Sequence, residues 1–218
     1  MFLAVRAAGE LSGPVKKQWE DKLVSTPRIE SKTAIVTGAA RGLGRAMAIG
    51  LLRAGANVSL VDIDGDELDN VAGEAAELAG EDRVLSVVTD VSDEAAVQRA
   101  VRATLGKFAD LAILINDAGI GPPANGRSLF NDPEKFWETD PAVWRKTVEV
   151  NTVGSYLMAS TSAPHMIEAG WGRIINVTTS LNAMYMAGCG AYGPSKAALE
   201  ANTSIMAQDL EGTGVTAN

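Results

Sequence analysis

The sequence predicts an α/β fold of three layers, in which helices cover both faces of a doubly wound parallel sheet. Short runs of β-branched and apolar residues, such as residues 33–36, are typical of strands buried on both faces. Stretches whose apolar residues recur at helical spacing separate these runs, so strand and helix alternate along the chain. The first two runs enclose a glycine-rich turn, around which the rest of the chain is organised.

The predicted elements follow one another in a regular order. Residues 33–36 form the first strand, a helix begins at Leu43, Gly55 and Asn57 end it, and residues 58–61 form the second strand. The same patterns predict the remaining elements, namely helices at 66–78, 94–105, 141–168 and 192–211, and strands at 84–88, 111–115, 172–177 and from 214 onward.

Prolines and glycines mark the interruptions. Residues 120–140 are rich in Gly, Pro and Asn and predict a long loop, with a short helix near residues 133–137. Pro141 suits the first turn of the next helix, because its missing N–H is not needed there. Pro164 should bend or loosen the last part of that helix.

Composition and charge argue against several classes of protein. The 218 residues suit one domain, and 46% hydrophobic and 21% charged residues are ordinary for a globular chain. A formal charge of −8 without a basic stripe argues against a nucleic-acid partner. There is no apolar run of ~18 residues for a membrane span and no signal-peptide core. Cys189 and His165 are single, so we expect neither an internal disulfide nor a zinc site, and a cytoplasmic protein.

The glycine turn is suited to binding an anion. Gly38, Gly42 and Gly44 lie at the start of a helix, whose N-terminus presents free N–H groups and about half a positive charge. Glycines let the backbone turn tightly and approach a pyrophosphate. Asp62 ends the second strand, 18 residues after Gly44, where a carboxylate accepts hydrogen bonds from ribose hydroxyls and repels a 2′-phosphate. This arrangement favours NAD, and a solvated Asp62 that merely opens a loop is the alternative.

Residues 37–44, TGAARGLG, resemble the T-G-x-x-x-G-x-G cofactor motif of the short-chain dehydrogenase/reductase family. In that family a base at the Arg41 position often accompanies NADP, and an acid at the Asp62 position accompanies NAD. We expect NAD, with NADP as the alternative, because the carboxylate would repel a 2′-phosphate whereas Arg41 can point to solvent. The resemblance implies a Rossmann fold, an NAD(P)-dependent oxidoreductase, and dinucleotide contacts from Gly38, Arg41, Gly42, Leu43, Gly44 and Asp62.

A second cofactor segment follows the third strand. Asp90 and Val91 occupy the place where the family has an acid beside the adenine ring. Alternatively, Asp90 or Ser92 caps the helix that starts near Glu94.

A third segment, NDAG at residues 116–119, resembles the family's N-N-A-G motif. There the Asn braces the sheet, and the Ala and Gly let the backbone lie against the cofactor. The resemblance thus implies that Asn116, Ala118 and Gly119 belong to the cofactor site. Asp117 departs from the motif, although it is a short polar residue with similar turn preferences.

Tyr192 and Lys196 carry the strongest chemical signal. Four residues apart at the start of a helix, they share one face. A free phenol has a pKa of about 10, too high for a base at neutral pH, and a nearby ammonium or an oxidised nicotinamide lowers it. A surface Tyr–Lys contact is the alternative. In this context the pair is similar to the family's catalytic Y-x-x-x-K signature, which implies that both residues also bind the cofactor and that Lys196 holds the nicotinamide ribose.

Two further residues complete the catalytic set that the resemblance implies. A serine after the fifth strand binds the substrate oxygen in the family; Ser180 and Thr179 both fit, and we favour Ser180 because its primary hydroxyl is less crowded. Asn151, in a V-N-x-x-G setting, matches an Asn that anchors a water for proton relay, although an Asn within a helix ordinarily faces solvent. Cys189 has no histidine partner and is expected to pack in the pocket wall.

The resemblance implies reversible hydride transfer between a nicotinamide cofactor and a small-molecule secondary alcohol or ketone, with Tyr192 as general acid/base. Met184, Tyr185 and Met186 indicate an apolar pocket wall. The alternative is a non-catalytic NAD(P)-binding module or an inactive fragment of a dehydrogenase.

We treat residues 1–30 as an N-terminal extension of unknown role and residues 31–218 as the dinucleotide-binding and catalytic domain. The sequence ends within the sixth strand, whereas family members continue, so we expect a domain that is C-terminally truncated relative to the family. The family assembles largely through the helices that contain Asn151 and Lys196. We therefore expect a homo-oligomer, either a dimer or a homotetramer.

Overall fold

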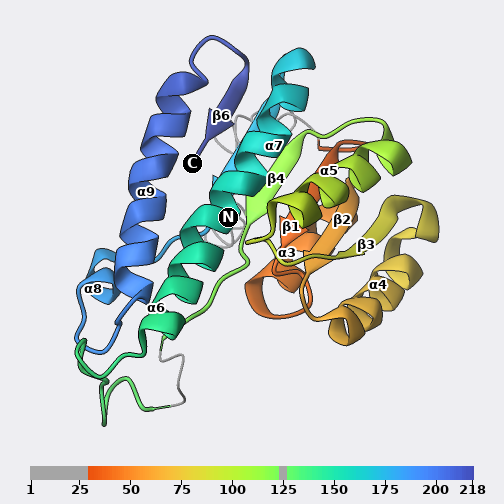
Figure 1. Ribbon diagram of the computed structural model, residues 1–218. Coiled ribbons are helices and arrows are strands. Elements are labelled where there is room, and N and C mark those ends of the chain that lie inside the picture. Colours follow the sequence, from red (N-terminus) through yellow and green to blue (C-terminus); the bar gives the residue numbers. More distant parts are fainter. Residues whose placement is uncertain (1–28, 123–126) are drawn as a thin grey trace, which may run out of the picture.

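The computed structural model describes residues 29–122 and 127–218, which form a six-stranded parallel sheet with flanking helices (Figure 1). The strand order is β3-β2-β1-β4-β5-β6. The predicted doubly wound fold is confirmed. Its strands are β1 (Thr33–Thr37), β2 (Asn57–Asp62), β3 (Val84–Val88), β4 (Ile113–Asn116), β5 (Gly172–Asn176) and β6 (Val215–Ala217).

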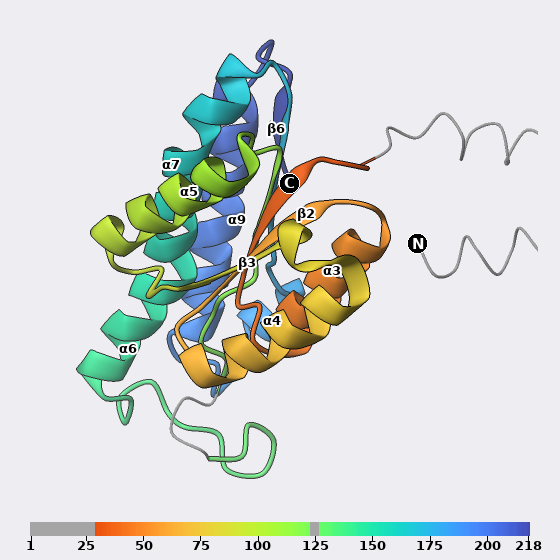
Figure 2. The ribbon, with the colours of Figure 1, turned by 90° about the vertical axis from the view of Figure 1, so that its right-hand side faces the viewer.

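Helices cover both faces of the sheet. Figure 2 shows α3 and α4 on one face, and α5, α6 and α7 on the other. Met206 of α9 joins the apolar core under α5 and α7, so α9 belongs to that second layer. The helices are α3 (Gly42–Arg53), α4 (Gly65–Ala79), α5 (Glu94–Phe108), α6 (Pro141–Val148), α7 (Ser155–Glu168), α8 (Leu181–Met184) and α9 (Tyr192–Asp209), with the short η1 (Glu81–Arg83) and the π-helical turn η2 (Glu149–Gly154).

The central strands are buried on both faces. Ile35 and Leu114 belong to the core under α5 and α7, whereas Val36 and Ile115 belong to the core under α3 and α4. Successive side chains of a strand point to opposite faces, so a strand between two cores needs apolar residues at every position. This requirement explains the continuous apolar runs in the sequence.

The strand order reverses at β1. β1 pairs with β2 on one side and with β4 on the other, and Thr37 is in register with both Val61 and Asn116. In open α/β sheets, ligands bind outside the carboxyl ends of the strands at this switch point.

The predicted helix over residues 141–168 consists of three segments. The π-helical turn η2 lies between α6 and α7, and Ser155 Oγ donates to the carbonyl oxygen of Asn151 at 3.1 Å there. Asn151 is buried, so it does not face solvent as an Asn in a helix ordinarily does. α7 continues through Pro164 to Glu168.

Two loop segments differ from the prediction. Residues 133–137 form an open segment and a turn where a short helix was expected. Residues 181–184, for which no helix was predicted, form α8, and Ser180 is its N-cap because Ser180 Oγ accepts a hydrogen bond from Ala183 N at 3.3 Å.

Residues 1–28 of the predicted N-terminal extension lie outside the described residues. Among the helices of residues 29–122 and 127–218, none combines the length and the apolar character needed to cross a bilayer.

Gly44 and Gly50 of α3 should respond in opposite ways to alanine. A Cβ on Gly44 would overlap the carbonyl oxygen of Gly38, whereas a Cβ on the exposed Gly50 meets nothing within 4 Å. We expect Gly44→Ala to lower the free energy of unfolding by about 2–3 kcal/mol, and Gly50→Ala to raise it by about 0.5–1 kcal/mol. Urea unfolding measures both, and equal stabilities would contradict the close packing of α3 on the glycine turn.

Candidate active site

The turn between β1 and α3 packs against the turn that follows β4. Gly38 has a φ of +69°, and a Cβ there would lie 2.9 Å from the amide nitrogen of Ala118. Gly42 has a φ of +57°, but the space beside it is open. The first glycine therefore permits a close approach within the protein, and the second leaves room for a ligand.

Thr37, the last residue of β1, joins the same two turns. Its buried Oγ1 accepts hydrogen bonds from the amide nitrogens of Asp117 and Ala118, each at 3.1 Å. The ends of β1 and β4 are thereby fixed to each other across the point where the strand order reverses.

A cavity of about 540 Å³, here called the switch-point cavity, opens at these strand ends. Most residues predicted to bind the cofactor line it, but Gly44, Asn116, Tyr192 and Lys196 do not. Its lining comprises Gly38, Arg41, Gly42, Leu43, Asp62, Ile63, Thr89, Asp90, Val91, Asp117, Ala118, Gly119, Ile120, Lys146 and Val150.

The start of α3 fits the pyrophosphate of a dinucleotide. Arg41 occupies the N-cap position without making a side-chain cap, and the first turn of α3 carries no acidic residue. The hydrogen bonds of the helix begin with Arg45 N to Arg41 O at 3.1 Å, so the N–H groups of Gly42 and Leu43 precede them. These N–H groups, the helix dipole and the open space beside Gly42 suit an anionic group in the switch-point cavity.

The Asp62 carboxylate lines the cavity at the end of β2. It accepts hydrogen bonds from the amide nitrogens of Ala40 and Asp64, both at 3.0 Å. Each carboxylate oxygen keeps a further lone pair for a ligand hydroxyl. The Arg41 side chain points to solvent and is 70% exposed, and its guanidinium forms an ion pair with Asp64.

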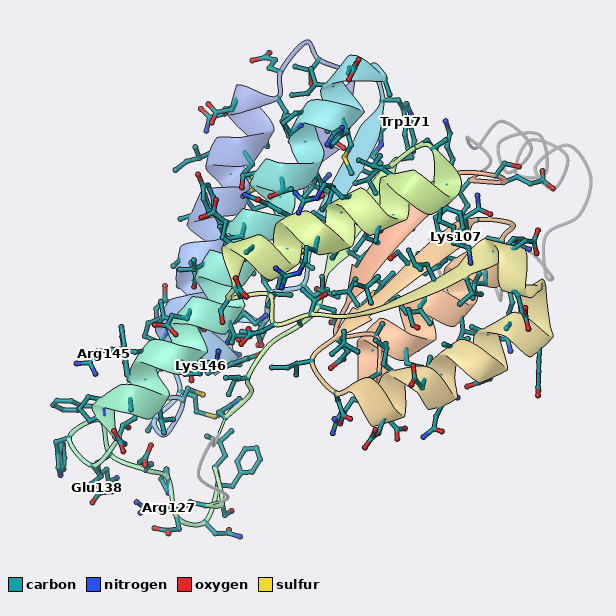
Figure 3. All side chains as sticks on the ribbon, turned by 45° about the vertical axis from the view of Figure 1, so that its right-hand side comes forward. Lys107, Arg127, Glu138, Arg145, Lys146 and Trp171 are labelled. Atoms are coloured by element: carbon teal, nitrogen blue, oxygen red, sulfur yellow. The ribbon has the colours of Figure 1, made fainter. Side chains whose placement is uncertain are left out.

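Asp90 lies at the end of β3 and is held from α6. Lys146 Nζ donates to Asp90 Oδ2 at 2.9 Å and to Ser92 Oγ at 2.8 Å. Figure 3 shows Lys146 on the inner side of α6, whereas the neighbouring Arg145 points away from the molecule. Burial raises the pKa of Asp90, but the bonds from Ser92 and Lys146 outweigh it and leave the pKa below its usual value. Asp90 is therefore an anchored, ionised carboxylate.

Neither Asp90 nor Ser92 caps α5, so the alternative reading of Asp90 is wrong. The N-cap of α5 is Asp93, whose Oδ1 accepts a hydrogen bond from Ala95 N at 2.9 Å.

Asn116 lies behind the switch-point cavity and not in it. Its Nδ2 donates to Ser155 O at 3.2 Å and to Asn176 Oδ1 at 2.9 Å. Asn176 Nδ2 in turn donates to Thr203 Oγ1 at 2.8 Å. These bonds tie β4 to α7, β5 and α9, so Asn116 braces the sheet beneath the site.

Lys196 and Tyr192 lie together at the start of α9. Lys196 Nζ is 5.9 Å from the centroid of the Tyr192 ring and donates to Val177 O at 2.7 Å. Lys196 is only 5% exposed. Burial lowers the pKa of Lys196, and the negative charge of Asp117 acts to raise it. An ammonium is thus held beside the phenol, at the end of β5.

Asn151 connects the cavity wall to the turn that carries Tyr192. Its Oδ1 accepts from Ile120 N at 2.7 Å, and its Nδ2 donates to Ile120 O and to Ser195 Oγ, both at 3.0 Å. Ser195 Oγ donates in turn to Tyr192 O at 2.8 Å. The buried amide therefore positions two parts of the site at once.

Gly119 is the residue where the cavity and the predicted catalytic residues meet. It lines the switch-point cavity, and a Cβ on it would lie 3.1 Å from Asn151 Oδ1 and 3.6 Å from Lys196 Nζ. A Cβ there would press on the Asn151 amide and contact Lys196. The structure therefore brings Asn151, Tyr192 and Lys196 to one end of the cavity.

Ser180 is not joined to this group. It is exposed, and within the described residues its Oγ accepts a hydrogen bond only from Ala183 N of α8. Thr179 is half-buried. Cys189 is buried, and burial raises the pKa of its thiol. It lies with Tyr192 in the wall of a small hollow.

Six residues that line the switch-point cavity were not predicted to do so: Ile63, Thr89, Asp117, Ile120, Lys146 and Val150. Lys146 and Val150 are four residues apart, a spacing that places both on one face of a helix. The sequence shows this spacing, but it does not show that this face of the helix lies next to the carboxyl end of β3.

Comparison with known proteins agrees with the geometry of the site. A family model described as short chain dehydrogenase matches residues 32–218. An NADPH-dependent aldehyde reductase-like protein, chloroplastic, of Arabidopsis thaliana is 35% identical over 87% of this chain and 71% of its own. The 2-(R)-hydroxypropyl-CoM dehydrogenase of Xanthobacter autotrophicus is 33% identical over 86% of this chain and 72% of its own.

A solved structure gives the same result. The 3-ketoacyl-(acyl-carrier-protein) reductase from Brucella melitensis, complexed with NADH, matches with a TM-score of 0.76 and 32% identity over 87% of this chain and 74% of its own. The matched region includes both the glycine turn and the Tyr192–Lys196 pair. The chain therefore belongs to the short-chain dehydrogenase/reductase family.

Proposed function

We propose that this chain transfers a hydride between NAD and a secondary alcohol or the corresponding ketone, with Tyr192 as the general acid/base. Family membership establishes the broader statement that it is an NAD(P)-dependent oxidoreductase of alcohols and ketones. The observation that carries the proposal is the buried Lys196 ammonium beside Tyr192, at the end of a cavity whose other end suits a dinucleotide. We keep residues 31–218 as the catalytic domain and a cytoplasmic location as predictions.

Tyr192 would move the proton. In the oxidation direction its phenolate takes the proton of the substrate hydroxyl, and in reduction its phenol returns one. The Lys196 ammonium stabilises the phenolate, and burial strengthens that interaction because the surrounding dielectric constant is low. A bound nicotinamide would supply the hydride acceptor or donor.

Ser180 and Asn151 would support this step in different ways. The Ser180 hydroxyl accepts one hydrogen bond from α8 and still has its own proton to donate to a substrate oxygen. Asn151 Nδ2 donates to Ile120 and Ser195 and its Oδ1 accepts from Ile120, which supports a role in positioning the site. Its part in anchoring a water for proton relay stays a prediction.

Asp62 supports the preference for NAD. Its carboxylate is fixed by two backbone N–H groups in the cavity, where it would receive ribose hydroxyls and repel a 2′-phosphate. Arg41, the residue that would favour NADP, is already paired with Asp64.

The substrate would meet an apolar wall. A hollow of about 320 Å³ next to α8 is bounded by aromatic and sulfur-containing side chains. Its Phe136 and Trp137 rings stack edge to face at 5.0 Å. These surroundings support a substrate of modest polarity. The apolar lining includes Phe136, Trp137, Met184, Tyr185 and Met186.

We also propose a homo-oligomer. α7 and α9 share a shallow apolar groove of about 150 Å³ that includes Tyr156 and Met206. Tyr156 is 50% exposed and Ile205 is 56% exposed on these two helices. This face supports assembly as a dimer or a tetramer.

Tyr192→Phe should abolish turnover without abolishing cofactor binding. The variant keeps the ring but loses the hydroxyl, so we expect kcat to fall by about 100-fold or more while the NAD dissociation constant changes little. Tyr156→Phe, on the exposed face of α7, is the matched control and should keep full activity. Steady-state kinetics and calorimetric NAD binding measure the two effects, and a Tyr192→Phe enzyme of normal rate would refute the assignment.

Asp62→Asn should relax the cofactor preference. Removing the charge at the end of β2 should raise the affinity for NADP relative to NAD by about tenfold or more. Asp66→Asn, which removes an exposed carboxylate outside the cavity at the start of α4, should leave the ratio unchanged. Thermal-shift titrations with each dinucleotide measure the ratio. If both variants behave alike, Asp62 does not select the cofactor.

A further inference from the structure

Asp117 is a carboxylate at a position where the N-D-A-G segment departs from the N-N-A-G pattern. It follows β4 directly, is half-buried, and lines the switch-point cavity. The turn does not need its side chain, because the main-chain N–H groups of Asp117 and Ala118 make the bonds to Thr37 Oγ1. The carboxylate instead faces the Gly44 N–H and the switch-point cavity.

The carboxylate lies between α3 and α9. A Cβ on Gly44 would be 3.0 Å from Asp117 Oδ2, so this oxygen sits against the first turn of α3. The charge of Lys196 on α9 acts on the same carboxylate. Two groups on neighbouring elements therefore act on Asp117: the charge of Lys196 and the N–H dipole of Gly44.

The position is energetically unfavourable for a carboxylate. Burial raises the pKa of Asp117, and the Gly44 N–H and the charge of Lys196 only partly offset this rise. A residue that destabilises the fold at a functional cleft is a candidate for a role in function. An amide of the same shape would avoid the cost.

The chemical consequence concerns the charge of the ligand. The two redox forms of a nicotinamide dinucleotide have the same pyrophosphate, but the oxidised nicotinamide carries a positive charge that the reduced one lacks. The Lys196 ammonium, which lies next to Gly119 of the cavity wall, repels that positive charge. A negative charge in the cavity attracts it, and the low dielectric constant of a partly buried site strengthens the effect.

We propose that Asp117 is a selectivity residue: its carboxylate raises the affinity of the switch-point cavity for the oxidised dinucleotide, NAD⁺, relative to the reduced form, NADH. It does so by offsetting the charge of Lys196 at the cofactor site. This inference rests on the proposed function. Asp117 makes no contact with the reacting atoms in this role; it acts on the relative affinities of the two redox forms.

Equilibrium binding of NAD⁺ and NADH to the full chain tests the proposal. The ratio of the NADH dissociation constant to the NAD⁺ dissociation constant should fall about tenfold in Asp117→Asn. Asp117→Ser, which also removes the charge, should lower the ratio in the same direction. Asp66→Asn is the control for a lost surface charge and should not change it. A purely structural role would weaken both ligands alike and leave the ratio constant.

The outcomes separate the two proposals. If the unaltered chain binds both dinucleotides and neither Asp117 variant changes the ratio by more than twofold, the selectivity role is overturned while the proposed function stands. If the unaltered chain binds neither dinucleotide, the proposed function fails, and the selectivity role fails with it.

Thermal unfolding supplies an independent readout. Because the pKa of Asp117 is raised in the folded state, the carboxylate destabilises the fold above that pKa, and this cost disappears as the pH falls below the ordinary Asp value. Asp117→Asn should therefore raise the Tm by about 2–4 °C at pH 7. The gain should shrink toward pH ~4. A lower Tm at pH 7 would mean that the carboxylate is structural and would overturn the proposal.

Discussion

The contact between the turns after β1 and β4 is the constraint on which the rest of the site depends. Gly38 lies against Ala118 without a side chain between them, and Thr37 Oγ1 binds two N–H groups of the neighbouring turn. If these turns separated, α3 would lose its position at the cavity and Gly119 would no longer meet Asn151 and Lys196. A few backbone contacts therefore determine where both the anion site and the proton-transfer site lie.

The parallel sheet then arranges the charges of the cavity in order. Asp62 ends β2, Asp90 and Asp117 follow β3 and β4, and Lys196 donates to the carbonyl oxygen that follows β5. Because the strands are parallel, their carboxyl ends meet at one edge, and the acids from the ends of β2, β3 and β4 gather there. Cations from the helices accompany these acids: Lys146 binds Asp90, and the charge of Lys196 acts on Asp117.

Local patterns in the sequence revealed most of the fold but little of its side-chain partnerships. The central strands β1, β2 and β4 are buried on both faces and therefore mostly apolar, which made them readable, whereas β3, β5 and β6 alternate buried and less buried positions. The N-cap of α5 could not be read from the sequence, because Asp90, Ser92 and Asp93 are all good cap residues and only the backbone path selects Asp93. Lys146 was missed because its bond to Asp90 spans 56 residues. Four-residue α8 has no periodicity to detect.

The π-helical turn η2 has a consequence for the long rod formed by α6 and α7. One extra residue in a turn shifts the phase of the residues that follow by about 100°. The two halves of the rod therefore face different neighbours: α6 meets α9, whereas α7 meets α5, β4 and β5. Asn151 sits at the step between them, held by Ser155 and Ser195. The irregular turn changes the direction in which the following side chains point, so that α7 packs on the core of the sheet while α6 packs next to the reaction site.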